Sequence, residues 1–443
     1  MTIWAARDKV GATASPETIR SFRLLLIGSS VSMLGTRLTS LAFPMLILWL
    51  TRSPVDAGWA AFATTGPSIL VYLPAGALVD RRDPRRVMLC SEFGRGLAVT
   101  GIVAMVLCWR SIPLLLLAAA VEECLEVFSS LAERRYVGSM IEREYASSAL
   151  GRFEGRTHAM IMMGRPLGGL LFEIGLAVPF LVDVLTFIFS FCVLLGIKGR
   201  PTDEEAVIAE LSKELDRRTG RALRRPHQPL HRPIWGDIHE GMTWIAGNRF
   251  ARAAVTLSAG TTLICQALII VFIAEAHARQ MSSTTIGVIL AMSGAGGALG
   301  SVIAARLKLP ARHSLIKVQI LVWSTVISIL VASGGRSATW MAAVMGILGF
   351  MGAMGNVEIA TYLVHNAKDK LARVTSIERL ISFTACAIGP VIGGYLFEQS
   401  GVQGAATWLL LIILVCGAYS ALTPSMQAHS RQIADNQNMQ EQS

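Results

Sequence analysis

The chain of 443 residues lacks the local patterns on which several classes of enzyme and pump depend. It has no G-x-x-x-x-G-K-[ST] loop, which disfavours an ATP-driven pump. It has no H-E-x-x-H or G-x-S-x-G, which disfavours a metallopeptidase or a serine hydrolase. None of its seven cysteines forms a C-x-x-C pair, so neither a disulfide framework nor a zinc site is indicated. We therefore expect no metal and no cofactor.

The chain also has little charge, with only 16% charged residues against 53% hydrophobic ones. Twelve apolar stretches are each long enough to cross a bilayer, which takes roughly 20 residues. They span 22–50, 58–79, 88–109, 112–133, 157–175, 177–198, 250–274, 284–305, 314–334, 338–364, 374–398 and 403–423. The sequence therefore predicts an all-α integral membrane protein with 12 transmembrane helices, six on each side of a charged insert.

The net charge of +10 is unevenly distributed across these stretches. Most of the 40 Lys and Arg residues fall in the N-terminus, the insert, the C-terminus and the loops on the same side. Only Arg52, Arg110, Arg279 and Arg336 lie in short loops on the other side. Basic residues mark the cytoplasmic face, so both termini should be cytoplasmic in a multi-pass protein of the cell membrane. This distribution explains the positive charge without a nucleic-acid partner.

The insert divides the chain into parts. We expect an N-terminal bundle over 1–198, a cytoplasmic linker over 199–248, a C-terminal bundle over 249–424 and a cytoplasmic tail over 425–443. A capping pattern at Thr202 and Glu205 predicts a short amphipathic helix that ends at Gly220. The basic stretch 221–232 either contacts anionic membrane lipids or is a solvated linker.

The two halves contain a repeated segment. Residues 164–173 read GRPLGGLLFE and residues 389–398 read GPVIGGYLFE, and both lie in the fifth span of their half. Two six-helix repeats around a central site are a recurrent plan in transporters. The repeated positions of interest are Gly164, Arg165, Gly168, Gly169, Gly389, Pro390, Gly393 and Gly394.

Residues 76–86, between the second and third spans, read GALVDRRDPRR. This segment resembles the signature loop of the major facilitator superfamily, and 389–394 resembles the antiporter motif of that superfamily. Gly35, residues 83–86, Arg95 and the Pro179 to Asp183 segment are most similar to bacterial drug–proton antiporters of the macrolide and enterobactin-exporter type. The resemblance implies two bundles around a central cavity and alternating access. Arg165 departs from the motif, which has proline there.

The signature loop has physical roles of its own. Gly76 would let two helices approach closely. The resemblance implies that Asp80 is a latch to the eleventh span when the cytoplasmic side is closed. The alternative is that the charged residues only fix topology. The signature-loop candidates are Gly76, Asp80, Arg81, Arg85 and Arg86.

Ionisable residues within spans indicate function because they are costly in a membrane. The fourth span holds Glu122, Glu123 and Glu126 on one broad helix face. Three adjacent carboxylates disfavour full ionisation, so at least one should hold a proton near neutral pH. Arg37 and Arg165 are the expected partners. A structural cluster neutralised by arginines is the alternative.

Other polar residues lie in spans that line the cavity in the superfamily. Gln266 and Asn356 are cavity candidates, and Glu358 is the next candidate for proton coupling. The sequence thus predicts a secondary exporter of a small amphipathic molecule, such as a drug, antibiotic or siderophore, that exchanges it for protons and functions as a monomer. A lipid or metabolite carrier of the same fold, a membrane sensor and an intramembrane enzyme are the alternatives.

The charge distribution makes a topological prediction. In a background without native cysteines, cysteines placed at Glu204 and Ser282 should react with a membrane-impermeant maleimide from opposite sides, Glu204 from the cytoplasm. Labelling of both from one side would contradict the 12-span count or the position of the insert.

Overall fold

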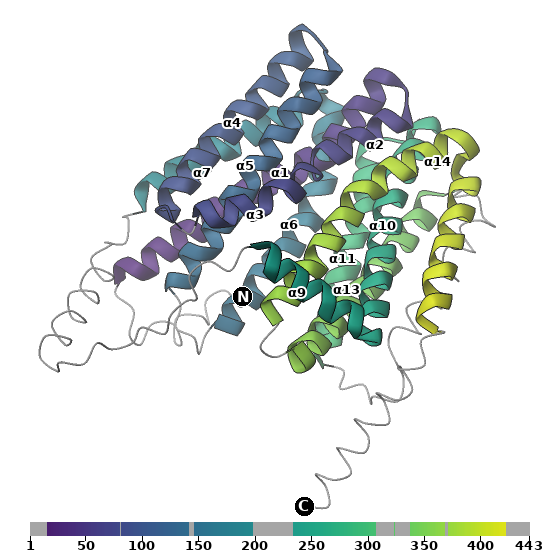
Figure 1. Cartoon of the computed structure of the whole chain (residues 1–443). Helices are drawn as coiled ribbons and strands as arrows, with labels where there is room; N and C mark the ends of the chain where they lie inside the picture. Colours follow the sequence, from purple (N-terminus) through teal and green to yellow (C-terminus); the bar gives the residue numbers. More distant parts are fainter. Residues whose placement is uncertain are drawn as a thin grey trace, which may run out of the picture.

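The computed structural model describes residues 16–79, 81–140, 146–197, 234–306, 323, 337–367 and 371–421. All regular secondary structure in these residues is helical, as predicted. Figure 1 shows the helices of 16–196, in purple to blue, beside those of 234–421, in teal to yellow. We call these two groups the N-terminal and C-terminal halves.

The N-terminal half contains α1 (Pro16–Thr51), α2 (Pro54–Ala63), α3 (Pro67–Val79), α4 (Pro84–Cys108), α5 (Ile112–Met140), α6 (Ala146–Ile174) and α7 (Val178–Gly196). The described part of the C-terminal half contains α9 (Ile234–Gly247), α10 (Arg249–Ala278), α11 (Ser283–Arg306), α13 (Ala338–Ala367) and α14 (Leu371–Ala421).

Local sequence fixes where several of these helices begin and end. Ser53, Asp83 and Asn248 are N-caps whose side chains accept backbone N–H bonds from the first turns of α2, α4 and α10. Arg52 and Gln280 adopt left-handed backbone conformations, with φ of 59° and 54°, directly after α1 and near the end of α10. These local signals explain why the predicted spans that begin at 58, 88 and 250 and end at 50 and 274 lie within four residues of the helix ends, whereas α6 begins 11 residues before its predicted span.

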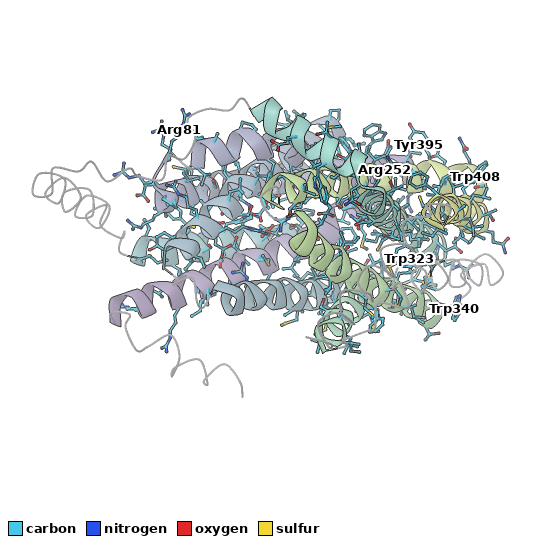
Figure 2. All side chains as sticks on the ribbon, turned by 60° about the horizontal axis from the view of Figure 1, so that its bottom comes forward. Arg81, Arg252, Trp323, Trp340, Tyr395 and Trp408 are labelled. Carbon is cyan, nitrogen blue, oxygen red and sulfur yellow. The ribbon has the colours of Figure 1, made fainter. Side chains whose placement is uncertain are left out.

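The predicted membrane crossings do not each correspond to one helix. Seven segments are long and apolar enough to cross a membrane, and one of these, Val374–Tyr419, has 46 residues and accommodates the eleventh and twelfth spans. That segment breaks at Gly401, whose φ of 63° interrupts the helix. The second span is divided between α2 and α3, while charged residues lower the hydropathy of α5 and α6. Of the ninth predicted span only Trp323 is described, buried in the C-terminal half (Figure 2).

The repeated segments make equivalent contacts in the two halves. A Cβ added at any of the glycines in these segments would come within 3.0 Å of a neighbouring helix, so only glycine permits the observed packing. Gly164 and Gly168 lie against α1, and Gly389 and Gly393 lie against α10, the first membrane helix of each half. Gly169 contacts α11 and Gly394 contacts α2, the second helical unit of the opposite half. This pseudo-symmetry agrees with internal duplication.

Polar contacts join the halves at the end of the bundle that carries the loops of Arg52 and Arg279. Arg52 donates a hydrogen bond to His277 Nε2 at 2.9 Å. The Thr284 N–H donates to Glu173 Oε1 at 2.8 Å, and the Ser53 hydroxyl donates to Glu398 at 3.4 Å. We call this the closed end, because α2 packs on α14 and α6 packs on α11 there.

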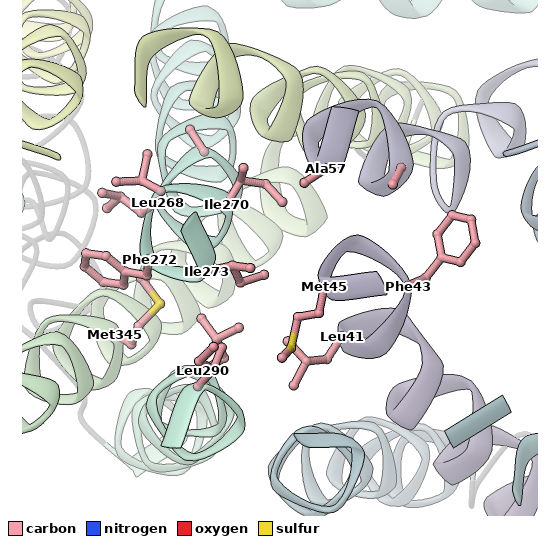
Figure 3. Close-up of a cluster of buried hydrophobic side chains, with 14 of the residues drawn as sticks. Leu41, Phe43, Met45, Ala57, Leu268, Ile270, Phe272, Ile273, Leu290 and Met345 are labelled. Atoms are coloured by element: carbon pink, nitrogen blue, oxygen red, sulfur yellow. The ribbon is translucent and has the colours of Figure 1, made fainter. Parts of the chain in front are cut away.

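A single cluster of buried apolar side chains also crosses between the halves on the closed-end side of Arg37. Figure 3 shows Leu41 and Met45 of α1 opposite Ile273 of α10 and Leu290 of α11. These four side chains are at most 6% exposed. We call this cluster the apolar seal, and burial of its side chains stabilises the contact between the halves.

Helix α9 lies within the predicted linker and was not predicted. It packs against α10 and α14. Its apolar residues Ile234, Ile238 and Ile245 recur at helical spacing, which was the available signal. The amphipathic helix predicted from Thr202 to Gly220 lies outside the described residues.

The close approach at Gly394 generates a test of the closed end. Gly394→Val should separate α2 from α14, because its side chain would collide with the Pro54 backbone. Cysteines at Ser53 and Glu398, in a background without native cysteines, should then cross-link several-fold less with a short bifunctional maleimide. Gly76→Ala is the matched control, since a Cβ there meets nothing within 4 Å. Equal cross-linking in all three proteins would contradict this packing.

Candidate functional site

Arg95 of α4 is the centre of a buried charge cluster in the N-terminal half. Its side chain is 2% exposed and contacts three carboxyl groups. Arg95 donates from Nε to Glu122 at 2.9 Å, and its Nη1 lies 3.3 Å from Glu92 and 2.5 Å from Glu126. Helix α5 packs on α4, which places Glu122 and Glu126 one turn apart on the face toward Arg95.

Hydroxyl groups and an aromatic ring complete the surroundings of this cluster. Arg95 donates to the Thr36 hydroxyl at 2.6 Å, and its guanidinium carbon lies 4.5 Å from the centre of the Phe187 ring. Ser32 and Ser129 donate to the two oxygens of Glu92 at 3.0 and 3.1 Å. Four helices therefore position the cluster: α1, α4, α5 and α7.

The charges of the cluster do not balance when all its groups are ionised. One guanidinium contacts three carboxyl groups, and an uncompensated charge at membrane depth costs several kcal/mol. Arginine keeps its proton, so the positive charge of the cluster is fixed and the carboxyl groups outnumber it.

The cluster corrects the expected partners of the span-four carboxylates. We expected Arg37 and Arg165, whereas Arg95 is the partner of Glu122 and Glu126. Arg95 also pairs with Glu92, three residues before it on α4. A guanidinium has five N–H donors, so one arginine can meet all three acids.

Arg165 reaches across the interface between the halves instead. Its Nη1 donates to the Leu290 carbonyl at 2.8 Å and to the Ser293 hydroxyl at 2.7 Å, both on α11. The Arg165 position in the repeat corresponds to Pro390, and the backbones of both approach a glycine of the other half, Gly287 and Gly58. Arg165 therefore adds polar contacts at a crossing that glycine makes close.

Asp183 of α7 is a second buried acid beside the cluster. It is 0% exposed, and the hydroxyls of Thr39 and Thr186 donate to it, each at 3.0 Å. A Cβ at Gly35 would overlap its carboxylate, so the glycine of α1 makes room for this acid. These contacts hold the acid of α7 against α1.

Two further charged candidates lie in the N-terminal half. The Cβ of Arg37 on α1 packs against Gly164 of α6, and Glu123 follows Glu122 on α5. Gln266 of α10 donates to Cys386 Sγ of α14 at 2.9 Å. We call Arg37, Glu123, Gln266 and Cys386 the central site, because each lies near the middle of a membrane helix. Asn356 is exposed on α13, and the Glu358 side chain lies outside the described residues.

The signature loop has mainly local contacts. Arg85 donates to the carbonyls of Leu194 and Leu195 at the end of α7, at 3.4 and 3.0 Å. Arg86 lies 3.7 Å from Asp83, and Arg81 is exposed at the edge of the bundle (Figure 2). Asp80 lies outside the described residues.

We expected Gly76 to let two helices approach closely, and this prediction is wrong in this conformation. A Cβ added there would meet no atom within 4 Å, so close packing does not require this glycine. The neighbouring helices are held by Arg135 of α5 instead, which donates to the backbone carbonyls of Val79 and Arg82.

The profile of the Major Facilitator Superfamily matches residues 25–256 and 253–436, one match for each half. The chain is 24% identical to the enterobactin exporter EntS of Shigella flexneri, over 90% of this chain and 93% of the relative. It is 34% identical to the multidrug efflux pump Tap of Mycolicibacterium fortuitum over 84 residues, 19% of this chain and 20% of the relative. These matches confirm the predicted resemblance.

Solved transporters share the fold. The nucleoside transporter NupG superposes with a TM-score of 0.64 at 11% identity, over 91% of this chain and 98% of that one. A bacterial homologue of the iron transporter ferroportin superposes with a TM-score of 0.62 at 14% identity, over 92% and 100%. With the two profile matches, these similarities confirm the predicted all-α membrane fold of 12 helices in two bundles.

The contacts of Arg95 predict a large effect of its removal. Arg95→Met leaves three acids without their cation, and breaking a buried ion pair costs about 3–5 kcal/mol. The melting temperature in detergent should fall by several degrees, and Arg95→Lys should recover part of the loss. Arg379→Met, at an exposed position of α14, is the control. A melting temperature of Arg95→Met equal to that of the control would contradict this account.

Proposed function

The chain belongs to the major facilitator superfamily of membrane transporters, and we propose that it is a proton-coupled exporter of a small amphipathic molecule. The relatives that match along their whole length are named exporters of enterobactin, and a partial match is a drug efflux pump. They support a substrate among drugs, antibiotics or siderophores. The protein would lie in the cell membrane with both termini in the cytoplasm, in keeping with the distribution of its basic residues.

The Arg95 cluster is the observation that carries the proposal of proton exchange. One cation contacts three carboxyl groups inside a membrane bundle, so the cluster is neutral only with bound protons. Each carboxyl group that loses a proton leaves a charge that the bundle must compensate by rearranging. Such a group links proton binding to a change of conformation.

The exposure of the carboxyl groups suggests a route for the proton. The Glu126 side chain is 32% exposed, that of Glu122 is 12% exposed and that of Glu92 is 5% exposed. Glu126 would exchange its proton with water, and Glu122 would receive it one helical turn deeper. Both carboxyl groups contact the same guanidinium, so they lie close together. When one is ionised, its negative charge favours protonation of the other.

The closed end supports alternating access. If the basic loops are cytoplasmic, then the end joined by Arg52, His277, Glu173 and Thr284 faces outward. The apolar seal around Leu41 and Leu290 lies on that outward side of the central site. The protein would then be open to the cytoplasm in this conformation, ready to accept substrate. Asp80 would be the latch that closes the cytoplasmic side in the opposite state.

Glu122→Gln tests this function. The amide mimics the protonated acid and cannot release a proton, so export of a fluorescent drug driven by a pH gradient in sealed vesicles should be abolished. Binding of the same drug in detergent should change little. Glu126→Gln should weaken export less, and Glu275→Gln, which alters an acid paired with Arg279 outside the cluster, is the control. Export by the triple Glu122/Glu123/Glu126→Gln variant would place the coupling elsewhere, with Glu358 next to be tested.

A further inference from the structure

A hydrogen bond at the closed end joins an arginine of one half to a histidine of the other. Arg52 directly follows α1, and its Nη1 lies 2.9 Å from Nε2 of His277, near the end of α10. These two helices are the first membrane helices of the N-terminal and C-terminal halves. The bond can therefore form only while the halves are together at this end.

The chemistry of the two groups fixes the proton on the histidine. A guanidinium has N–H donors, no acceptor and a permanent charge, so His277 Nε2 must accept through its lone pair. The ring is therefore neutral, with its hydrogen on Nδ1. A proton added to the ring would turn Nε2 into a donor and would place a second positive charge against Arg52.

The backbone holds both residues in place. The φ of Arg52 is 59°, and its N–H donates to the Leu48 carbonyl at 2.9 Å, so the residue closes the last turn of α1. Ala276, which precedes His277, is 0% exposed, and its carbonyl accepts from the Met281 N–H at 2.9 Å. After protonation the side chains must turn away or the helices must part, and the bond across the halves is lost in either case.

The helix that carries His277 does not supply a compensating acid. Glu275 is two residues earlier, which places it about 200° around the axis of α10. It pairs with Arg279, one turn further along. In the part of the chain that the structure describes, no ion pair with an acid is formed by Arg52 or His277.

The elements packed against α10 supply no acid for the pair among the described residues either. Asp56 of α2 forms no ion pair there, and Glu398 of α14 accepts from the Ser53 hydroxyl. The first turns of α11 and α13, which lie towards this end, contain no acid. Helix α9 precedes the opposite end of α10, and Arg336 lies outside the described residues.

We infer that His277 is a second proton-binding site, separate from the Arg95 cluster, and that its protonation releases the closed end. Neutral His277 accepts from Arg52 and holds the halves together, whereas protonated His277 repels the guanidinium. If the closed end faces outward, acid outside the cell would favour the outward-open state. The inference goes beyond the proposed function, because it concerns the contact between the halves whichever molecule is carried.

The expected effect is a shift of populations. The close crossings at Gly169 and Gly394 and the apolar seal remain when the bond is lost, so the closed state persists in part. A hydrogen bond from a charged donor contributes about a factor of ten or more to an equilibrium. Protonation of His277 should thus raise the ratio of open to closed molecules about tenfold.

Distances between the halves at about pH 8 and about pH 5.5, on either side of the ordinary histidine pKa of about 6.5, test the inference. Spin labels at Arg110 and Gln403, both exposed, would be placed on the full chain without native cysteines in lipid nanodiscs. Double electron–electron resonance should show mainly the short distance at the higher pH, and a larger population of the long distance at the lower pH. His158→Gln, which removes a histidine of α6, is the control and should respond as wild type.

Two variants separate the titration of His277 from a structural role. His277→Gln keeps an acceptor but cannot be protonated, so its open-to-closed ratio at the lower pH should be about tenfold below that of wild type. Any response of the Arg95 cluster is common to both proteins and cancels in this comparison. Arg52→Glu reverses the partner charge, so protonated His277 would be attracted. Its change with pH, measured relative to His277→Gln, should have the opposite sign to that of wild type.

Three outcomes would overturn the inference. They are a wild-type distance distribution that is the same at both pH values, a response of His277→Gln equal to that of wild type, and a response of Arg52→Glu with the wild-type sign. Drug export in vesicles is a separate measurement. Export without a response of His277 would overturn this inference and leave the exporter, whereas the predicted distances without export would sustain the inference and overturn the exporter.

Discussion

The cost of holding a guanidinium inside a membrane bundle governs the organisation of the N-terminal half. Arg95 is 2% exposed, and five helix-borne groups meet its N–H donors and the face of its guanidinium. Glu92, Glu122, Glu126 and Thr36 come from three different helices, so α1, α4 and α5 cannot separate without breaking these contacts. The same cluster is the one through which we propose that protons act, because its carboxyl groups outnumber its cation.

The helix packing is duplicated in the two halves, whereas the Arg95 cluster lies in the N-terminal half. The glycines of the repeated segments give both halves the same helix contacts, and the halves meet at equivalent crossings, α6 with α11 and α14 with α2. The contacts of Arg95, however, lie within the N-terminal half alone. At the crossings, Arg165 adds hydrogen bonds where the other half has Pro390. The Arg95 cluster thus belongs to one half, whereas the close glycine crossings are common to both.

The sequence predicted most membrane helices because a span depends on the hydropathy of its own residues. It did not predict α9, which is short and lies within a charged insert. The contacts between side chains were harder to predict from the sequence, because they depend on which helix faces meet. Glu122 and Glu126 were identified as functional candidates, but their partner Arg95 is 27 and 31 positions away along the chain and on another helix. Among the described residues, Arg37 Nε is buried without a hydrogen bond, which could be found only from the structure.

Helix α5 connects the two sets of charges by its periodicity. Successive residues are about 100° apart, so Glu122 and Glu126 share a face, and Glu123 lies about 60–100° around the helix from them. The first two contact Arg95, and Glu123 makes no ion pair with it. In the function that we propose, a shift of α5 that follows a change of protonation in the Arg95 cluster would move Glu123 as well, because one helix carries all three acids.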